Sequence, residues 1–317
     1  MTSTFQRSIG RGVVSFETGK LAQQANGSVL IQEGDNVLLL TATMAKPREG
    51  IDFFPLTVEL EERLYARGKI PGSFFRREGR PSTDSILIAR MTDRPIRPLF
   101  PKGFRNEVQI VITPLSSDTE TPFDTLALTG ASAALTISDI PFDGPIAATR
   151  VAYLDGDYLI NPSFDEITDS KLDIIVAGSQ DGVIMMEAGA KQVSEDIVLE
   201  AIRRAQDVNL ELISLQHETA RAVGKPVANY QRRAYDPDLT DTSLREDVLR
   251  WRAESGFPSG GVAVDALVVP GAGVRECRLV RRLQKHVVTM DPAVFTDVVP
   301  PRELPEFAGP VAGDPED

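Results

Sequence analysis

The stretch TLALTGASAALTIS, residues 125–138, is built almost entirely from small and apolar residues. Asp124 stands directly before it and can cap the start of a helix. Gly130 and the alanines that follow it have little or no side chain, so a helix made from them can approach neighbouring backbone closely. We therefore expect a central, buried helix around which the rest of the fold packs.

Segments on both sides of this helix carry the apolar and β-branched patterns of strands. The expected strands are 29–31, 37–43, 53–60, 107–113, 151–160 (with an Asp-Gly-Asp turn), 172–176 and 183–186. The turn Glu-Gly-Asp-Asn, residues 33–36, joins the first two strands into a hairpin. A long helix with one apolar face is expected from Ser194 to Val223. This order predicts an α+β domain of about 230 residues, with mixed sheets packed against helices.

The composition restricts the chemistry. The chain has 317 residues, of which 42% are apolar and 25% charged, with one cysteine (Cys277) and two histidines (His217 and His286). One cysteine excludes a disulfide within the chain and a cysteine-based metal cluster. Because two histidines leave little for imidazole chemistry, catalysis would need carboxylates, arginines or a bound cation. Neither a membrane-spanning apolar run nor a signal-peptide core is found, and we expect a cytoplasmic protein with no membrane partner.

Positive charge is concentrated in one segment of an acidic chain. The net charge is −12, yet residues 63–105 contain eleven Lys or Arg and only three acids, a net charge of +8 that leaves −20 on the rest. An acidic remainder repels a polyanion everywhere else, so this basic segment is a directed feature.

The segment contains the loop FFRREGRPS, residues 74–82. Arginine side chains can contact successive phosphates, and phenyl rings offer faces on which unpaired bases stack. The candidate nucleic-acid-binding residues are therefore Phe74, Phe75, Arg76, Arg77 and Arg80. The pattern suits single-stranded nucleic acid read without sequence preference. A solvated basic face or a salt-bridged subunit contact would show the same residues.

A helix is expected after this loop. Pro81 and Ser82 suit its first turn and cap, and Pro95 is expected to end it. Arg90, Arg94 and Arg97 are spaced so that at least two share one helix face. They could hold the loop through internal ion pairs or contact a ligand.

Carboxylates that could bind Mg²⁺ do not form a persuasive pattern. Asp155 and Asp157 suit a turn, and a group of acids around 165–173 precedes a strand, where a structural or surface role is expected. No phosphate-binding glycine loop, nucleophile elbow or dinucleotide fingerprint is found. We assign no catalytic residue and no metal ligand.

Long ordered motifs resemble a known family. The stretches FFPLTVELEERLYARGKIPGSFFRREGRPS and DRPIRPLFPKGF are similar to the first RNase PH-like core of polynucleotide phosphorylase (polyribonucleotide nucleotidyltransferase). Further similarity lies in GKLAQQANGSVLIQEGDNVLLLTA, GASAALTISDIPFDGP and VAGSQDGVIMMEAGAKQVSEDIVLEAI. The resemblance extends over about residues 8–237.

The resemblance implies an RNase PH-like fold and a function. Members form a ring-shaped homotrimer that degrades single-stranded RNA from its 3′ end with inorganic phosphate, assisted by Mg²⁺, and releases nucleoside diphosphates. The FFRREGR loop of the first core lines the central channel and guides RNA. The phosphate and metal sites belong chiefly to a second core, which this sequence does not contain.

Two departures affect catalysis. In the catalytic core of the family, a pair of carboxylates six residues apart precedes a strand similar to DIIVAG; here the later position is Asp173 and the earlier one is Ile167. A serine-containing phosphate loop belongs where this chain has LTGASAAL, with only Ser132 available. We therefore expect this core to bind and position RNA rather than cleave it.

The chain is expected to consist of an RNase PH-like core, residues 1–235, and an irregular tail, residues 236–317. Prolines and glycines break any long periodicity in the tail, so we expect either disorder or a truncated or frame-altered product. In the favoured reading, a separate catalytic core is the expected partner that supplies the chemistry. Two other readings stay open: a stand-alone RNA-binding or scaffold protein, and an independent RNase PH-like enzyme that forms its active sites by self-assembly.

Overall fold

The helix expected at the centre of the fold is α2 (Asp124–Ile137), and twelve of its fourteen residues are buried. The structure is a computed structural model that describes residues 2–48, 53–72 and 79–230, all within one unit, Met1–Arg233. Gly27 meets α2 so closely that a Cβ atom there would lie 2.0 Å from the carbonyl oxygen of Ala134. The predicted close approach of this helix to neighbouring backbone is confirmed.

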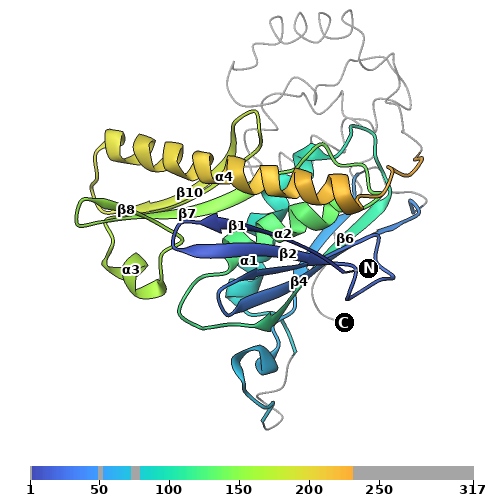
Figure 1. Cartoon of the computed structure of the whole chain (residues 1–317), viewed down its shortest axis with the longest axis horizontal. Helices are drawn as coiled ribbons and strands as arrows, with labels where there is room; N and C mark the ends of the chain where they lie inside the picture. Colours follow the sequence, from blue (N-terminus) through green and yellow to red (C-terminus); the bar gives the residue numbers. More distant parts are fainter. Residues whose placement is uncertain (1, 49–52, 73–78, 231–317) are drawn as a thin grey trace, which may run out of the picture. The chain divides into compact units, whose positions relative to one another are not determined.

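A six-stranded mixed sheet packs against α2 (Figure 1). Its strands, in spatial order, are β1 (Ser3–Ile9), β2 (Gly12–Thr18), β3 (Gly27–Glu33), β4 (Asn36–Ala45), β6 (Glu107–Ser116) and β5 (Leu56–Leu60). Neighbours are antiparallel except β5 and β6, which are parallel. Alternate residues of β4 are buried, as a half-buried strand requires. The predicted hairpin of β3 and β4 is confirmed, whereas β1 and β2 were not predicted.

A second sheet of four antiparallel strands has the order β10 (Val183–Ala190), β9 (Leu172–Gly178), β7 (Ala147–Leu154) and β8 (Asp157–Ile160). Helix α4 (Glu195–Val223) crosses one face of this sheet, where Ala201 and Ala205 pack on Val151 and Ile174 (Figure 1). Helix α2 contacts β7, and Ile175 joins the core that surrounds α2. The predicted α+β architecture of mixed sheets and helices is confirmed.

Helix α1 (Thr83–Ile96) packs against β5 and α2, and carries the second half of the basic segment. The side chain of Ser82 accepts a hydrogen bond from the backbone N–H of Ser85, so the predicted helix start is confirmed. Pro95 does not end the helix as predicted, because α1 reaches Ile96 and continues as the 3-10 helix η3 (Arg97–Leu99). A further 3-10 turn, η1 (Leu64–Arg67), follows β5.

Three further details of the prediction need correction. Asp124 is the first residue of α2 rather than its cap, since Phe123 holds the N-cap position and makes no side-chain cap hydrogen bond. The strand expected from residue 53 begins only at Leu56. A short helix, α3 (Phe164–Asp169), was not predicted; its capping box links Ser163 and Glu166.

Among the described residues, no helix combines the length and the hydrophobicity that a membrane crossing requires. Residues 236–317, predicted as an irregular tail, lie outside the described part of the chain.

Candidate functional site

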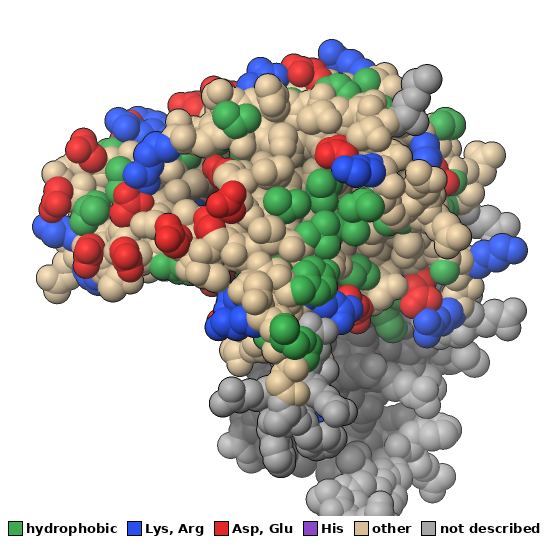
Figure 2. Space-filling model, turned by 60° about the horizontal axis from the view of Figure 1, so that its bottom comes forward, with side chains coloured by type: hydrophobic (Ala, Val, Ile, Leu, Met, Phe, Trp, Pro, Cys, Tyr) green, Lys and Arg blue, Asp and Glu red, His purple; other side chains and the backbone are tan. Residues whose placement is uncertain are grey.

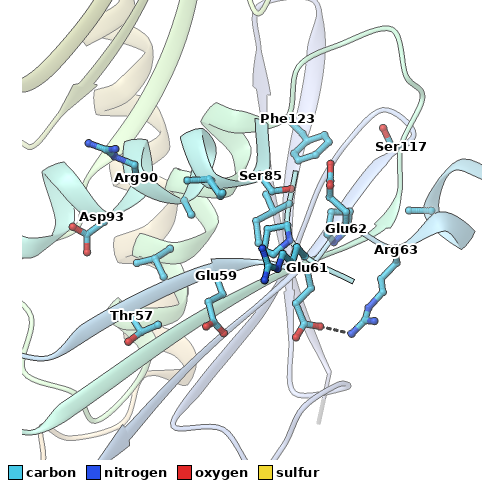
Figure 3. Close-up of a pocket in the computed structure, with 18 of the residues that line it drawn as sticks. Thr57, Glu59, Glu61, Glu62, Arg63, Ser85, Arg90, Asp93, Ser117 and Phe123 are labelled. Atoms are coloured by element: carbon cyan, nitrogen blue, oxygen red, sulfur yellow. Dashed lines mark hydrogen bonds and ion pairs between the residues drawn. The ribbon is translucent and has the colours of Figure 1, made fainter. Parts of the chain in front are cut away.

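The base of the predicted RNA-binding loop opens into a groove of about 870 Å³ between β5, η1 and α1 (Figure 3). Arg80 and its neighbours Gly79 and Pro81 line this groove. Phe74, Phe75, Arg76 and Arg77 lie outside the described residues. Of the five predicted RNA-binding side chains, the structure therefore places only Arg80, in the lining of the groove.

The groove has mixed charge. The charged lining residues are Arg63, Arg67, Arg80, Arg90 and Arg97, with Glu59, Glu61, Glu62 and Asp93. Glu61 pairs with Arg63 (Figure 3). Glu59 accepts a hydrogen bond from the Gln109 amide at 3.0 Å. Glu59, Glu61 and Glu62 are exposed and repel a phosphate backbone, so an anion would be attracted to those lining arginines that have no acidic partner.

Four arginines of this region are exposed and make no ion pair or hydrogen bond among the described residues: Arg67, Arg80, Arg90 and Arg94. Figure 3 shows Arg90 extending from α1 on the side of the groove away from Glu61. Unpaired, exposed guanidinium groups keep all their donors for a ligand. We call these four the rim arginines: Arg67, Arg80 and Arg90 line the groove, and Arg94 lies one turn after Arg90 on α1.

Arg97 has a different role from its neighbours on the helix. Its guanidinium forms two hydrogen bonds to the Asp93 carboxylate, at 2.6 and 2.9 Å, and donates to the carbonyl oxygens of Phe54 and Leu56. These bonds connect the end of α1 to β5 and the segment before it. Of these three arginines, Arg97 therefore makes hydrogen bonds within the domain, whereas Arg90 and Arg94 are available to a ligand.

The basic side chains do not produce a uniformly positive face. On the face shown in Figure 2, Lys and Arg side chains lie interspersed with Asp and Glu, and hydrophobic side chains lie between them. Positive charge that could guide RNA is thus local, at the rim arginines and the adjoining loop, rather than spread over this face.

A second cluster of charged residues lies inside the domain, where the resemblance placed a catalytic carboxylate. Asp173, near the start of β9, accepts hydrogen bonds from Arg150 Nε (2.8 Å) and Nη2 (3.2 Å). Arg150 Nη1 donates to Asp124 Oδ2 at 2.8 Å. Burial opposes the charge on Arg150, but the two carboxylates outweigh it and raise the pKa of the guanidinium.

Sequence reasoning did not single out Arg150, although a signal was present. It is the only charged residue in the strand AATRVAYL, and a charged side chain in an apolar strand requires a partner. Asp124 was assigned only as a helix cap, and its pairing with Arg150 was not foreseen.

Ser132, the only serine available in the stretch LTGASAAL, is fully buried. Its hydroxyl donates to Gln216 Oε1 at 2.8 Å and accepts from the backbone N–H of Ile146 at 2.9 Å. Both contacts connect α2 to neighbouring elements. Ser132 is therefore a core hydrogen-bonding residue and cannot reach a phosphate in solution.

The residues of the described ranges do not fit a bound Mg²⁺. No group of three or more His, Cys, Asp or Glu side chains suited to a metal occurs there. Asp173 is engaged by Arg150, the paired position holds Ile167, and Glu166 is bound by Arg11 at 2.8 and 2.9 Å. Hard cations need several converging oxygen ligands, which this arrangement lacks.

Comparison with known proteins places these features in a family. Residues 13–141 match the model of the 3′ exoribonuclease family, domain 1, and residues 144–208 match domain 2 of the same family. The rice (Oryza sativa) protein Rrp46 has a similar fold, with a TM-score of 0.51 at 14% identity, over 69% of this chain and 94% of that one.

Relatives of higher identity are polyribonucleotide nucleotidyltransferases. That of Roseiflexus sp. (strain RS-1) is 46% identical over 292 residues, 92% of this chain and 37% of the relative. That of Halothermothrix orenii is 53% identical over 238 residues, 75% of this chain and 34% of the relative. The first alignment is longer than 230 residues, so it includes part of residues 231–317.

The chain thus spans about a third of the length of the curated relatives it matches. Both family domains lie within the single described unit, in the order in which the family has them. This chain belongs to the 3′ exoribonuclease (RNase PH) family and is a homologue of polyribonucleotide nucleotidyltransferase.

Proposed function

We propose that this chain is the RNA-guiding, ring-forming first core of a polyribonucleotide nucleotidyltransferase. The complete enzyme would degrade RNA from the 3′ end by phosphorolysis and release nucleoside diphosphates. The chemistry, with inorganic phosphate and Mg²⁺, would belong to a complementary core, in the same protein or in a separate one. The family membership and the identity to a third of each relative support this assignment.

The observation that carries the non-catalytic role is the pairing of Asp173 with Arg150. A carboxylate that holds a cation must offer its oxygens to that cation, but both oxygens of Asp173 accept hydrogen bonds from the guanidinium. With Ile167 at the paired position and Ser132 in the core, we expect no group among the described residues of this site to polarise phosphate or to stabilise a leaving group.

RNA would be guided by the rim arginines together with Phe74, Phe75, Arg76, Arg77 and Arg80 of the loop. Exposed guanidinium groups bind phosphates of any sequence, and the phenyl rings would stack on unpaired bases at about 1–3 kcal/mol per base. The carboxylates of the groove would repel the strand and favour its contact with the rim arginines. The resulting binding is specific for single strands and independent of base sequence.

A phosphorolysis assay tests whether this core binds RNA without cleaving it. The purified chain is incubated with single-stranded RNA, inorganic phosphate and Mg²⁺, and nucleoside diphosphates are measured. We expect RNA binding without diphosphate release. Release of diphosphates by this chain alone, not abolished by removing any contaminating nuclease, would show that it carries a complete active site.

Salt dependence tests the RNA path. Affinity for single-stranded RNA should fall with salt, each phosphate contact contributing a log–log slope of about −0.7. The double variants Arg76→Ala/Arg77→Ala and Arg90→Ala/Arg94→Ala should each make the slope shallower by up to about 1.4, because each removes two contacts.

Arg97→Ala, at the C-cap of α1, is the matched control. It removes a cation that is bound to Asp93 and to two backbone carbonyls, so it should lower stability and leave the slope nearly unchanged. An unaltered slope in both double variants would assign these arginines to structural roles and refute the proposed path.

A further inference from the structure

Arg150 lies between the carboxylates of Asp173 and Asp124, and Asp173 is the position at which the family resemblance implies a catalytic carboxylate. We propose that the guanidinium of Arg150 is a built-in substitute for a divalent cation, so that the carboxylate site of this core is closed by its own side chains. The inference rests on the proposed function, in which this core guides RNA and does not cleave it.

The guanidinium of Arg150 places a positive charge between two carboxylates, as a metal ion bound by two acids would. Arg150 makes two bonds to Asp173 and one, through the remaining terminal nitrogen, to Asp124 at 2.8 Å. The three side chains are only 16%, 25% and 13% exposed, respectively. Ion pairs this well covered are screened far less by salt than surface pairs are.

Sheet register and helix placement together build this cluster. Asp173 of β9 lies opposite Ala152 of β7, which puts Arg150, two residues earlier, on the same face and diagonal to it. Asp124 is the first residue of α2, which packs against β7. A helix N-terminus favours negative charge, and Asp124 supplies it from within the chain.

A charge count explains what Arg150 prevents. With Arg150 the cluster carries −1, from two carboxylates and one guanidinium. Without it, two carboxylates would remain close together and partly covered, an arrangement that is unfavourable unless a cation enters. Removing Arg150 should therefore create an affinity for a divalent cation that the natural protein lacks.

The experiment is a cation rescue of Arg150→Ala. Thermal unfolding of the natural chain, R150A and R150A/D173N is measured with about 10 mM MnCl₂, since weak carboxylate sites bind in the millimolar range, and with KCl at matched ionic strength. We expect Tm to fall by roughly 5–10 °C in R150A, and MnCl₂ to restore at least about half of that loss.

The natural chain should gain nothing from MnCl₂, and R150A/D173N, which lacks one carboxylate, should not be rescued. If R150A does not fold in KCl, refolding in MnCl₂ replaces the melting curve, and recovery of the folded state only with MnCl₂ supports the proposal. No Mn²⁺-dependent gain in R150A, or an equal gain in the natural chain, would overturn it.

This outcome can be separated from the proposed RNA function. The readouts here are stability and Mn²⁺ dependence, with no RNA present. A failed rescue alongside salt-dependent RNA binding by the natural chain would refute only the role of Arg150. Loss of RNA binding alongside a successful rescue would refute only the RNA path.

Discussion

Glu166 has an unusually acidic carboxyl group because several donors stabilise its charged form. Arg11 donates two hydrogen bonds to it, at 2.8 and 2.9 Å, and the backbone N–H of Ser163 donates another at 2.8 Å. Together these bonds lower its pKa from 4.5 to about 2, with Arg11 the largest cause. Glu166 therefore keeps its negative charge down to lower pH than a free glutamate does.

Replacing Arg11 by methionine should raise the pKa of Glu166, though to a value still below 4.5, because Ser163 remains. A carboxyl group whose pKa is lower in the folded state than in the unfolded state stabilises the fold at pH values above its unfolded-state pKa. This stabilisation is lost as the pH falls through the folded-state pKa. Arg11 is largely exposed, so we expect a loss of only about 0.2–1 kcal/mol at pH 7, vanishing below about pH 2.

NMR titration of the Glu166 side chain measures its pKa in the natural chain and in R11M. Urea unfolding at several pH values measures the loss of stability. An unaltered Glu166 pKa in R11M would show that the helix cap, and not the ion pair, depresses it.

At the scale of elements, the contact between α2 and β3 depends on a glycine in the strand. A Cβ atom at Gly27 would lie 2.0 Å from the carbonyl oxygen of Ala134 and 2.9 Å from Ser138 Cβ. At Gly130 the nearest atom is the flexible end of Leu40, 2.5 Å away. Gly27 tolerates an added methyl group less well than Gly130 does, because a backbone carbonyl of a helix cannot move away as the end of a side chain can.

Gly27→Ala should therefore reduce the free energy of unfolding by about 2–3 kcal/mol, and by more than Gly130→Ala does. Gly189→Ala in β10 is the matched control, since nothing lies within 4 Å of its Cβ position and the change should stay within about 0.5 kcal/mol. Urea denaturation of the three variants gives the comparison. Equal losses at Gly27 and Gly189 would contradict the tight contact between helix and strand.

At the scale of the whole molecule, we propose that three copies form the ring of the family. Large hydrophobic side chains are exposed on α1 (Ile86 and Leu87, 49% and 56%) and on β10 (Met186, 52%), and such groups are often covered by subunit contacts. Sedimentation equilibrium at several concentrations should give about 104 kDa, three times 34.6 kDa. A mass of one chain at every concentration would contradict the ring.

Much of the fold could be predicted from local patterns. The small residues of α2, the Gly34-Asp35 hairpin and the apolar stripe of α4 each produced a correct element. Strands β1 and β2 were missed. The residues of β1 are mostly polar and only its last, Ile9, is buried, so its pairing with β2 rather than its own hydrophobicity makes it a strand.

Part of the candidate site was expected from the sequence as well. The basic segment and Arg80 were identified from charge and spacing. Arg80 and Arg90 line one groove, Arg94 follows one turn after Arg90, and none of the three has a partner among the described residues. Their role in RNA binding stays a prediction. The tie formed by Arg97 was left open by the sequence. Its partners include backbone carbonyls some forty residues away, which no spacing rule identifies.

The sequence by itself determined the composition of the core, the type of most elements and the concentration of positive charge, because these properties depend on residues that are neighbours along the chain. Only the tertiary structure decided that Arg150 joins Asp124 and Asp173, 26 and 23 residues away. That contact requires both the register of β7 on β9 and the packing of α2 against the sheet. Long-range pairing of this kind results from how the elements pack, which a local pattern does not encode.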